Sequence, residues 1–161
     1  MTSERKTWKE KLEDPKGFPK TIGFSDRLPC CKTLQKLGAQ SGDDVVLAPP
    51  SAVKEIMGNV PKGKLITLNA LCSQLAKRYK TNYCCTLTTG IFVMVAANAA
   101  AETWENFPYW RTIKNNGELN PKFPGGLEGH KKLLEQEGFK VRSKGKNYIV
   151  EDYREYLQVE D

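Results

Sequence analysis

Histidine, spaced cysteine motifs and long apolar runs are all scarce in this chain. The 161-residue sequence has a single histidine, His130, and its five cysteines form no Cys-x-x-Cys motif. Zinc sites are usually built from such spaced cysteines and histidines, so we predict neither a metal site nor a cofactor. The odd cysteine count, with two adjacent pairs, is also unlike the disulfide framework of a secreted domain.

No stretch of the sequence is apolar enough to suggest a membrane protein. The least polar one, residues 87–101, has 15 residues, three of them Thr or Asn. A transmembrane helix needs about 20 apolar residues, so this stretch is too short to span a bilayer. The Lys-rich N-terminus is not followed by an apolar segment, which argues against a secretory signal. We therefore predict a cytoplasmic protein without a membrane partner.

Acidic residues are missing between residues 56 and 101. The basic residues of this segment contribute five of the positive charges in a chain whose net charge is +6: Lys62, Lys64, Lys77, Arg78 and Lys80. A basic tract without carboxylates attracts a phosphate backbone, because no like charge opposes the attraction. The same tract also fits a merely solvated basic surface, so it favours nucleic acid only slightly.

The remaining composition is that of a globular protein, with 39% hydrophobic and 27% charged residues. The length suits one domain with a core and an N-terminal extension. We place the extension at residues 1–49 and the domain at residues 50–161. Within the extension, Trp8 and Leu12 share one helical face, residues 28–37 suggest a short helix, and residues 45–47 suggest an extended piece.

Several helices are predicted by apolar residues that recur every three or four positions. One starts at Ser51, its expected N-cap, and runs to residue 60; the clearest spans residues 68–79, capped by Thr67. A polar bend separates the second from another helix at residues 88–103, which suggests a helix-turn-helix. Residues 127–137 are expected to form a further helix, ended by a glycine. The alternation in residues 139–150 predicts a β-hairpin.

A resemblance to a known family rests on the order of several motifs. Residues 107–117 read Phe-Pro-Tyr-Trp-Arg-Thr-Ile-Lys-Asn-Asn-Gly, and a Gly-Gly turn and the helix ending in Leu-Leu-Glu-Gln-Glu-Gly follow. This succession resembles the site region of the 6-O-alkylguanine-DNA alkyltransferases, which carry Pro-Cys-His-Arg-Val. Residues 53–64, with a Val-Pro-Lys-Gly-Lys turn, resemble the family's entry helix. The resemblance covers about residues 50–157.

The resemblance implies a fold that is mainly α with a small β-hairpin. The fold would be a winged helix-turn-helix-like domain similar to the alkyltransferase C-terminal domain, with an active-site strand at residues 108–112. The acceptor cysteine of the family is replaced by Tyr109, and its histidine by Trp110. A phenol titrates near 10 and stays protonated at neutral pH, so it does not replace a thiolate as alkyl acceptor. The chain is therefore most similar to the alkyltransferase-like proteins, which bind damaged DNA without repairing it.

This likeness implies a non-enzymatic protein that recognises alkylated guanine in double-stranded DNA and hands it to a downstream repair protein. The lesion pocket would be formed by Pro108, Tyr109, Trp110 and Arg111, with no catalytic residue among them. A buried aromatic pair beside a surface arginine is the alternative interpretation of the same residues.

The DNA contacts implied by the resemblance come from two places. Lys62 and Lys64 would contact phosphates from the basic turn, and Thr88, Thr89 and Gly90 would do so from the start of the second helix. The family's phosphate-rotating tyrosine and its arginine at the start of the recognition helix both have no counterpart in this sequence.

Two further functions remain open. One is an interaction protein that kept the scaffold and lost DNA binding, which fits the missing tyrosine and arginine. The other is an active methylated-DNA-protein cysteine methyltransferase that uses a different cysteine, with Cys85 as the candidate before the second helix.

Overall fold

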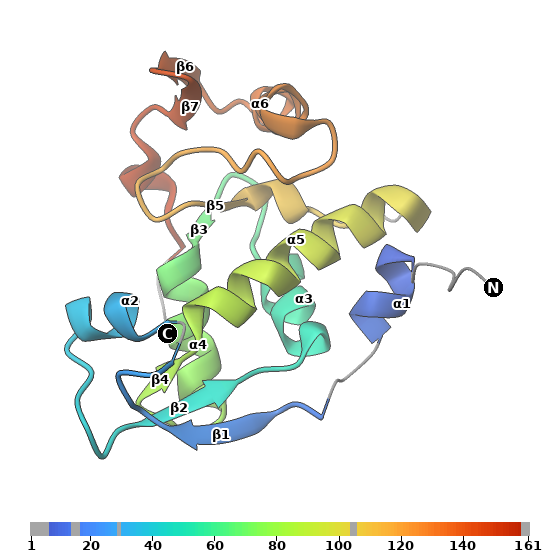
Figure 1. The fold of residues 1–161 in the computed structure, drawn as a ribbon. Coiled ribbons are helices and arrows are strands. Elements are labelled where there is room, and N and C mark those ends of the chain that lie inside the picture. Colours follow the sequence, from blue (N-terminus) through green and yellow to red (C-terminus); the bar gives the residue numbers. More distant parts are fainter. Residues whose placement is uncertain (1–6, 14–16, 29, 104–105, 159–161) are drawn as a thin grey trace.

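The computed structural model describes residues 7–13, 17–28, 30–103 and 106–158 (Figure 1). The fold is mainly α. Its helices are α1 (Trp8–Glu13), α2 (Cys31–Lys36), α3 (Pro50–Gly58), α4 (Leu68–Arg78), α5 (Thr86–Thr103) and α6 (Gly126–Gln136), with short 3-10 helices η1 (Tyr109–Arg111) and η2 (Tyr153–Tyr156). Within the described ranges, none of these helices combines the length and apolarity that a bilayer crossing requires.

The strands are short and form three small sheets. The first has the order β1 (Lys20–Gly23), β2 (Asp44–Leu47), β4 (Tyr83–Cys84), and the second pairs β3 (Ile66–Thr67) with β5 (Thr112–Ile113) in parallel. The third is the antiparallel hairpin of β6 (Val141–Lys144) and β7 (Asn147–Val150). The predicted C-terminal hairpin is thereby confirmed.

Helix α5 runs through the centre of the fold and contacts α1, α3 and α4 (Figure 1). Its apolar residues are buried on most of its circumference, from Phe92 to Ala100. Such a helix has no single apolar face, because it is covered from several sides. The first turns are the exception, since Leu87 and Ile91 are exposed there.

The helix predictions hold for α4 and need correction elsewhere. Thr67 caps α4 as expected, with its hydroxyl accepting from the backbone N–H of Ala70 at 3.3 Å. The prediction that Ser51 caps α3 is wrong: Pro49 is the N-cap, and Pro50 occupies the first turn, where its missing N–H costs nothing. Helix α5 begins at Thr86, two residues before the predicted start.

The predicted strand over residues 108–112 is also wrong for most of its length. Tyr109–Arg111 form the 3-10 helix η1, closed by a hydrogen bond from the Arg111 N–H to the Pro108 carbonyl at 3.3 Å. The chain becomes extended only at Thr112, because β3 offers a partner to Thr112 and Ile113 alone.

A left-handed glycine ends α6 and leads the chain into the hairpin. Gly138 has a φ of 95°, a conformation that glycine adopts without a steric penalty. The N–H of Phe139 then donates back to the Leu134 carbonyl at 3.2 Å, which completes the helix end.

The residues before position 50 pack against the rest of the fold. The predicted helix and extended piece appear as α2 and β2, and β2 pairs in parallel with β4. Leu12 of α1 is buried in the main core, and the Glu102 carboxylate at the end of α5 accepts from the N–H of Trp8 at 3.2 Å. Helix α5 is therefore supported from the N-terminal side of the chain.

Candidate functional site

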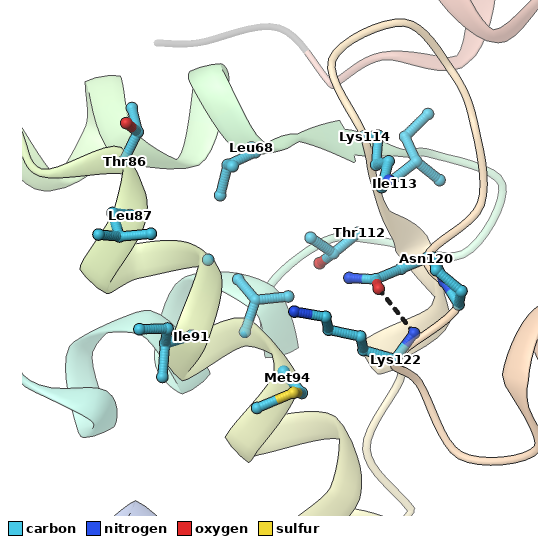
Figure 2. A pocket seen from close by; sticks show the side chains of 13 residues that line it. Leu68, Thr86, Leu87, Ile91, Met94, Thr112, Ile113, Lys114, Asn120 and Lys122 are labelled. Carbon is cyan, nitrogen blue, oxygen red and sulfur yellow. Dashed lines mark hydrogen bonds between the residues drawn. The ribbon is translucent and has the colours of Figure 1, made fainter. Parts of the chain in front are cut away.

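A cavity of about 340 Å³ opens between the first half of α5 and the segment after β5 (Figure 2). Its walls are mainly apolar. The space in front of Gly90 is open, since a Cβ at that position would meet no atom closer than the Leu68 Cδ2 at 3.9 Å. The cavity is lined by Leu68, Thr86, Leu87, Gly90, Ile91, Val93, Met94, Thr112, Ile113, Lys114, Asn120, Pro121 and Lys122.

Thr112 gives this apolar cavity a polar group without a partner. Its side chain is 2% exposed, and its Oγ1 has no hydrogen-bond partner among the described residues. Figure 2 shows the side chain pointing from β5 into the space in front of α5. A buried hydroxyl left unsatisfied costs about 1–3 kcal/mol, so Thr112 Oγ1 is an unused hydrogen-bonding group in the wall of the cavity.

The wall opposite α5 carries two cationic side chains. Lys114 and Lys122 are exposed, and Figure 2 shows the Lys122 side chain extending across the cavity towards α5. The Asn120 Oδ1 accepts from the Lys122 backbone N–H at 2.9 Å, which fixes the turn that carries this lysine. The cavity therefore combines an apolar body with positive charge at its edge.

None of the four predicted pocket residues, Pro108–Arg111, lines this cavity; they lie directly before Thr112 in the chain, and Tyr109–Arg111 form η1. Tyr109 is 8% exposed, and its ring packs edge-on against Trp110 and Phe123, with centroids 5.4 and 5.5 Å away. Burial raises the pKa of the Tyr109 phenol, which keeps it neutral. The aromatic pair belongs to the core.

Arg111 holds η1 in place through a largely buried ion pair. Its Nη2 lies 2.5 Å from the Glu137 Oε2 and its Nε 2.9 Å from Oε1, and the two side chains are only 13% and 11% exposed. Trp110 Nε1 donates to the same carboxylate at 2.8 Å, and Arg111 Nη1 donates to the Val60 carbonyl at 2.8 Å. Its hydrogen bond with Arg111 is the main reason that the pKa of Glu137 is lowered.

His130 forms hydrogen bonds at both ends of the segment from Trp110 to Asn120, which includes cavity-lining residues. It is fully buried; its Nε2 donates to the Trp110 carbonyl at 2.8 Å, and its Nδ1 accepts from the Asn120 N–H at 3.1 Å. Burial lowers the pKa of His130 to about 4, so the ring is neutral at physiological pH. These contacts give His130 a structural role in the packing of this segment.

The two threonines predicted to contact phosphate are placed differently from one another. Thr89 is 1% exposed, and its hydroxyl donates to the Cys85 carbonyl at 2.7 Å. Thr88 is half-buried and interacts with the Cys85 sulfur, with its N–H 3.5 Å and its Oγ1 3.3 Å from Sγ. Gly90, the third member of the predicted set, lines the cavity.

Lys62 and Lys64 lie in the predicted turn between α3 and β3, and both are exposed. The positive charge of Lys62 helps to lower the pKa of Glu137, so this lysine lies on the same side of the molecule as the Arg111 ion pair. Neither lysine lines the cavity.

The cysteines are placed away from the cavity. Cys85, the candidate alkyl acceptor, is 4% exposed. A hydrogen bond between Cys72 and Cys84 raises the pKa of the first and lowers that of the second, and burial raises the pKa of Cys30 to about 12. Within the part of the chain that the structure describes, no three Cys, His, Asp or Glu side chains gather as a metal site.

Apart from Gly90, the predicted site residues do not include those that line the cavity. Leu68, Thr112 and Asn120 come from three separate segments, and only the pairing of β3 with β5 brings the first two together. One signal was present, because Thr112 stands where the quoted family motif has an apolar valine.

Comparison with known proteins finds the fold in solved structures only. No family model matches the sequence, and no curated protein matches it. The structure of the S. pombe ATL protein in complex with DNA is similar, with a TM-score of 0.53, 16% sequence identity, and coverage of 69% of this chain and 94% of that chain. S. pombe Atl1 in complex with damaged DNA containing O6-carboxymethylguanine gives a TM-score of 0.51 and 18% identity over the same shares. The chain described here thus shares its mainly α fold with small sheets with S. pombe Atl1.

Proposed function

We propose that the protein binds double-stranded DNA and recognises alkylated guanine without carrying out chemistry on it. The observation that carries the proposal is the cavity beside α5, which is apolar, edged by lysines and supplied with an unpaired buried hydroxyl. The solved structures with a similar fold contain DNA in one case and O6-carboxymethylguanine DNA in the other. The acid-free basic tract favours the same partner.

In this proposal the alkylated base leaves the helix and occupies the cavity. Extruding a base costs a few kcal/mol, least for a weakened pair, and the cavity must recover that cost by apolar contact and hydrogen bonds. Leu68, Ile91 and Met94 offer the contact, and Thr112 Oγ1 offers a hydrogen bond. Pro108–Arg111 position Thr112 from the preceding segment of the chain, and the β6–β7 hairpin is the wing of a winged helix.

The cysteine positions count against alkyl transfer. An acceptor thiolate must reach the alkyl carbon of the bound base. Cys85, by contrast, is buried, its sulfur is hydrogen-bonded to the Thr88 hydroxyl, and it does not line the cavity. We therefore assign recognition alone to this chain, and a repair protein that acts on the marked site completes the process.

Fluorescence anisotropy tests the proposal with two duplexes that differ by a single 6-O-methylguanine, each measured at two salt concentrations. We expect tighter binding to the modified duplex at both. Equal, salt-sensitive binding would leave a general DNA-binding protein, and no binding at low salt would favour the interaction protein. Irreversible mass gain on one cysteine after incubation would instead establish alkyl transfer.

Replacing Thr112 with valine tests the hydroxyl in the cavity. The side chains have nearly the same shape, so we expect binding to the modified duplex to weaken about tenfold while binding to the unmodified duplex is unchanged. Thermal unfolding should show no loss of stability, because the change removes an unpaired buried hydroxyl. Thr103→Val is the control, since that hydroxyl already donates to the Ala99 carbonyl at 3.0 Å. Equal weakening on both duplexes would contradict the assigned role.

Replacing Lys62 and Lys64 together with alanine tests the basic turn. Each lost phosphate contact lowers the slope of log K against log salt by about 0.9, so the double variant should bind every duplex more weakly and with a smaller slope. The control is Lys20→Ala, which removes an exposed lysine from the outer strand β1, away from the basic turn. Unchanged slopes would place the phosphate contacts elsewhere.

A further inference from the structure

A second cavity, of about 660 Å³, lies between α2, α4 and β4 and shares no lining residue with the cavity beside α5. Two thiols form part of its wall, that of Cys72 on α4 and that of Cys84 on β4. Both side chains otherwise lie in the main core, where they are 5% and 2% exposed. We call this space the thiol cavity, and it is large enough to admit a small polar solute.

The two thiols of the cavity contact each other. Strand β4 packs against α4 (Figure 1), because the turn between them folds the chain back, with the Thr81 N–H donating to the Ala76 carbonyl at 2.9 Å. Cys72 and Cys84 are thereby joined by a hydrogen bond between their side chains, and the Thr89 Oγ1 lies 3.3 Å from the Cys84 Sγ. All five cysteines are free thiols, so both sulfurs are available for reaction.

The surroundings of the pair make its two members chemically different. The hydrogen bond with Cys72 lowers the pKa of the Cys84 thiol, against the opposing effect of burial. The same hydrogen bond, together with burial, raises the pKa of the Cys72 thiol. The thiolate is the nucleophilic form of cysteine, so Cys84 is suited to attack and Cys72 keeps its proton for a later step.

We propose that Cys72 and Cys84 are a redox site that reacts with hydrogen peroxide in the thiol cavity and closes as a disulfide. The Cys84 thiolate attacks one peroxide oxygen, the O–O bond breaks, and the other oxygen leaves as hydroxide and is protonated to water. The Cys72 thiol then attacks the sulfur of the resulting sulfenic acid. The S–S bond forms, and the sulfenic oxygen leaves as water with the Cys72 proton. The two sulfurs lose two electrons in total, and the peroxide gains them.

This inference does not rest on the proposed function. It concerns a different cavity, and it is tested without DNA. Its structural effect would be a covalent link between α4 and β4, the strand that leads into α5.

The test treats the full-length wild-type protein with a small excess of hydrogen peroxide, followed by thiol counting under denaturing conditions and by mass spectrometry. We expect two of the five thiols to disappear and the intact mass to fall by two hydrogen atoms. Peptide mapping, with fragmentation between Cys84 and Cys85, should place the cross-link between Cys72 and Cys84. Dithiothreitol should restore all five thiols, because a disulfide is reversible.

Four single variants assign the steps. Cys84→Ser should form no disulfide, and Cys72→Ser should stop at a sulfenic acid on Cys84 that dimedone traps. Cys85→Ser is the matched control, because this neighbour does not line the thiol cavity and its loss should leave the disulfide at the wild-type yield. Cys31→Ser, which removes a half-buried thiol, should do the same. Circular dichroism checks that each variant remains folded.

The mapping of the wild-type protein decides the inference even if a variant fails to fold. Retention of all five thiols, or a cross-link between Cys30 and Cys85, the other hydrogen-bonded pair, would overturn it. A gain of oxygen that dithiothreitol does not reverse would also overturn it, since it would show over-oxidation in place of a disulfide. None of these results bears on the binding of DNA, so the two proposals stand or fall separately.

Discussion

Replacing Arg111 with alanine is expected to lower the free energy of unfolding by about 3–5 kcal/mol, because it leaves the Glu137 carboxylate buried without its charge partner. The carboxylate is 11% exposed and keeps only the Trp110 indole as a donor of those described here. The Val60 carbonyl loses its hydrogen bond from Arg111 in the same step. We expect a correspondingly lower midpoint in urea unfolding, with little change in the denaturant slope.

Two further variants show whether the loss comes from the burial of the pair. Arg78 and Glu55 form an exposed pair at 3.1 Å, with side chains 36% and 60% exposed, so Arg78→Ala should cost less than about 1 kcal/mol. The double variant Arg111→Met/Glu137→Leu replaces both charges with apolar groups and should recover much of the stability lost by Arg111→Ala. If Arg111→Ala cost no more than Arg78→Ala, the ion pair would not support η1.

Local sequence patterns predicted the elements of the fold that depend on neighbouring residues. Thr67 and the apolar spacing after it predicted α4 with its cap, and the alternation around a glycine turn predicted β6 and β7. These features depend on neighbours in sequence, through helix periodicity, capping and turn preference. The order of the motifs also led to the right fold class, because this order can be read from the sequence without knowing the tertiary contacts.

The surroundings of the predicted site residues depend on contacts between distant segments, which local sequence patterns do not show. Tyr109 and Trp110 read as stacking surfaces in sequence, yet Phe123 and Glu137, further along the chain, turn them into a packed wall. The strand predicted at this place became η1, since β3 pairs with two residues only. Thr89 likewise reads as a phosphate contact until the Cys85 carbonyl takes its hydroxyl. A pattern names residue types, and tertiary packing decides which of their groups face solvent.

As the pH is lowered, the protein is expected to lose stability through His130 first. The Glu137 carboxylate of the ion pair takes up a proton only at lower pH. The folded protein holds the pKa of this histidine at about 4, against 6.5 for an exposed imidazole, because burial disfavours the charged ring. The unfolded chain therefore binds a proton between about pH 6.5 and 4 that the folded chain does not. Stability present above pH 6.5 is lost as the pH falls through this window, by about 3 kcal/mol in total.

Urea unfolding at intervals from pH 7.5 to 4.5 measures this dependence, with His130→Gln as the comparison. The variant lacks the titrating ring and should be less stable at pH 7, yet its stability should change little across the window. The lowered pKa of Glu137 reduces stability only when the pH falls below the ordinary value of 4.5. The measured range, which ends at pH 4.5, therefore reports on His130 and not on Glu137. Since the folded protein keeps His130 neutral above about pH 4, its bonds to Trp110 and Asn120 persist, and His130 should not change binding to the modified duplex over the window. Equal pH dependence in both proteins would show that the loss arises from another group.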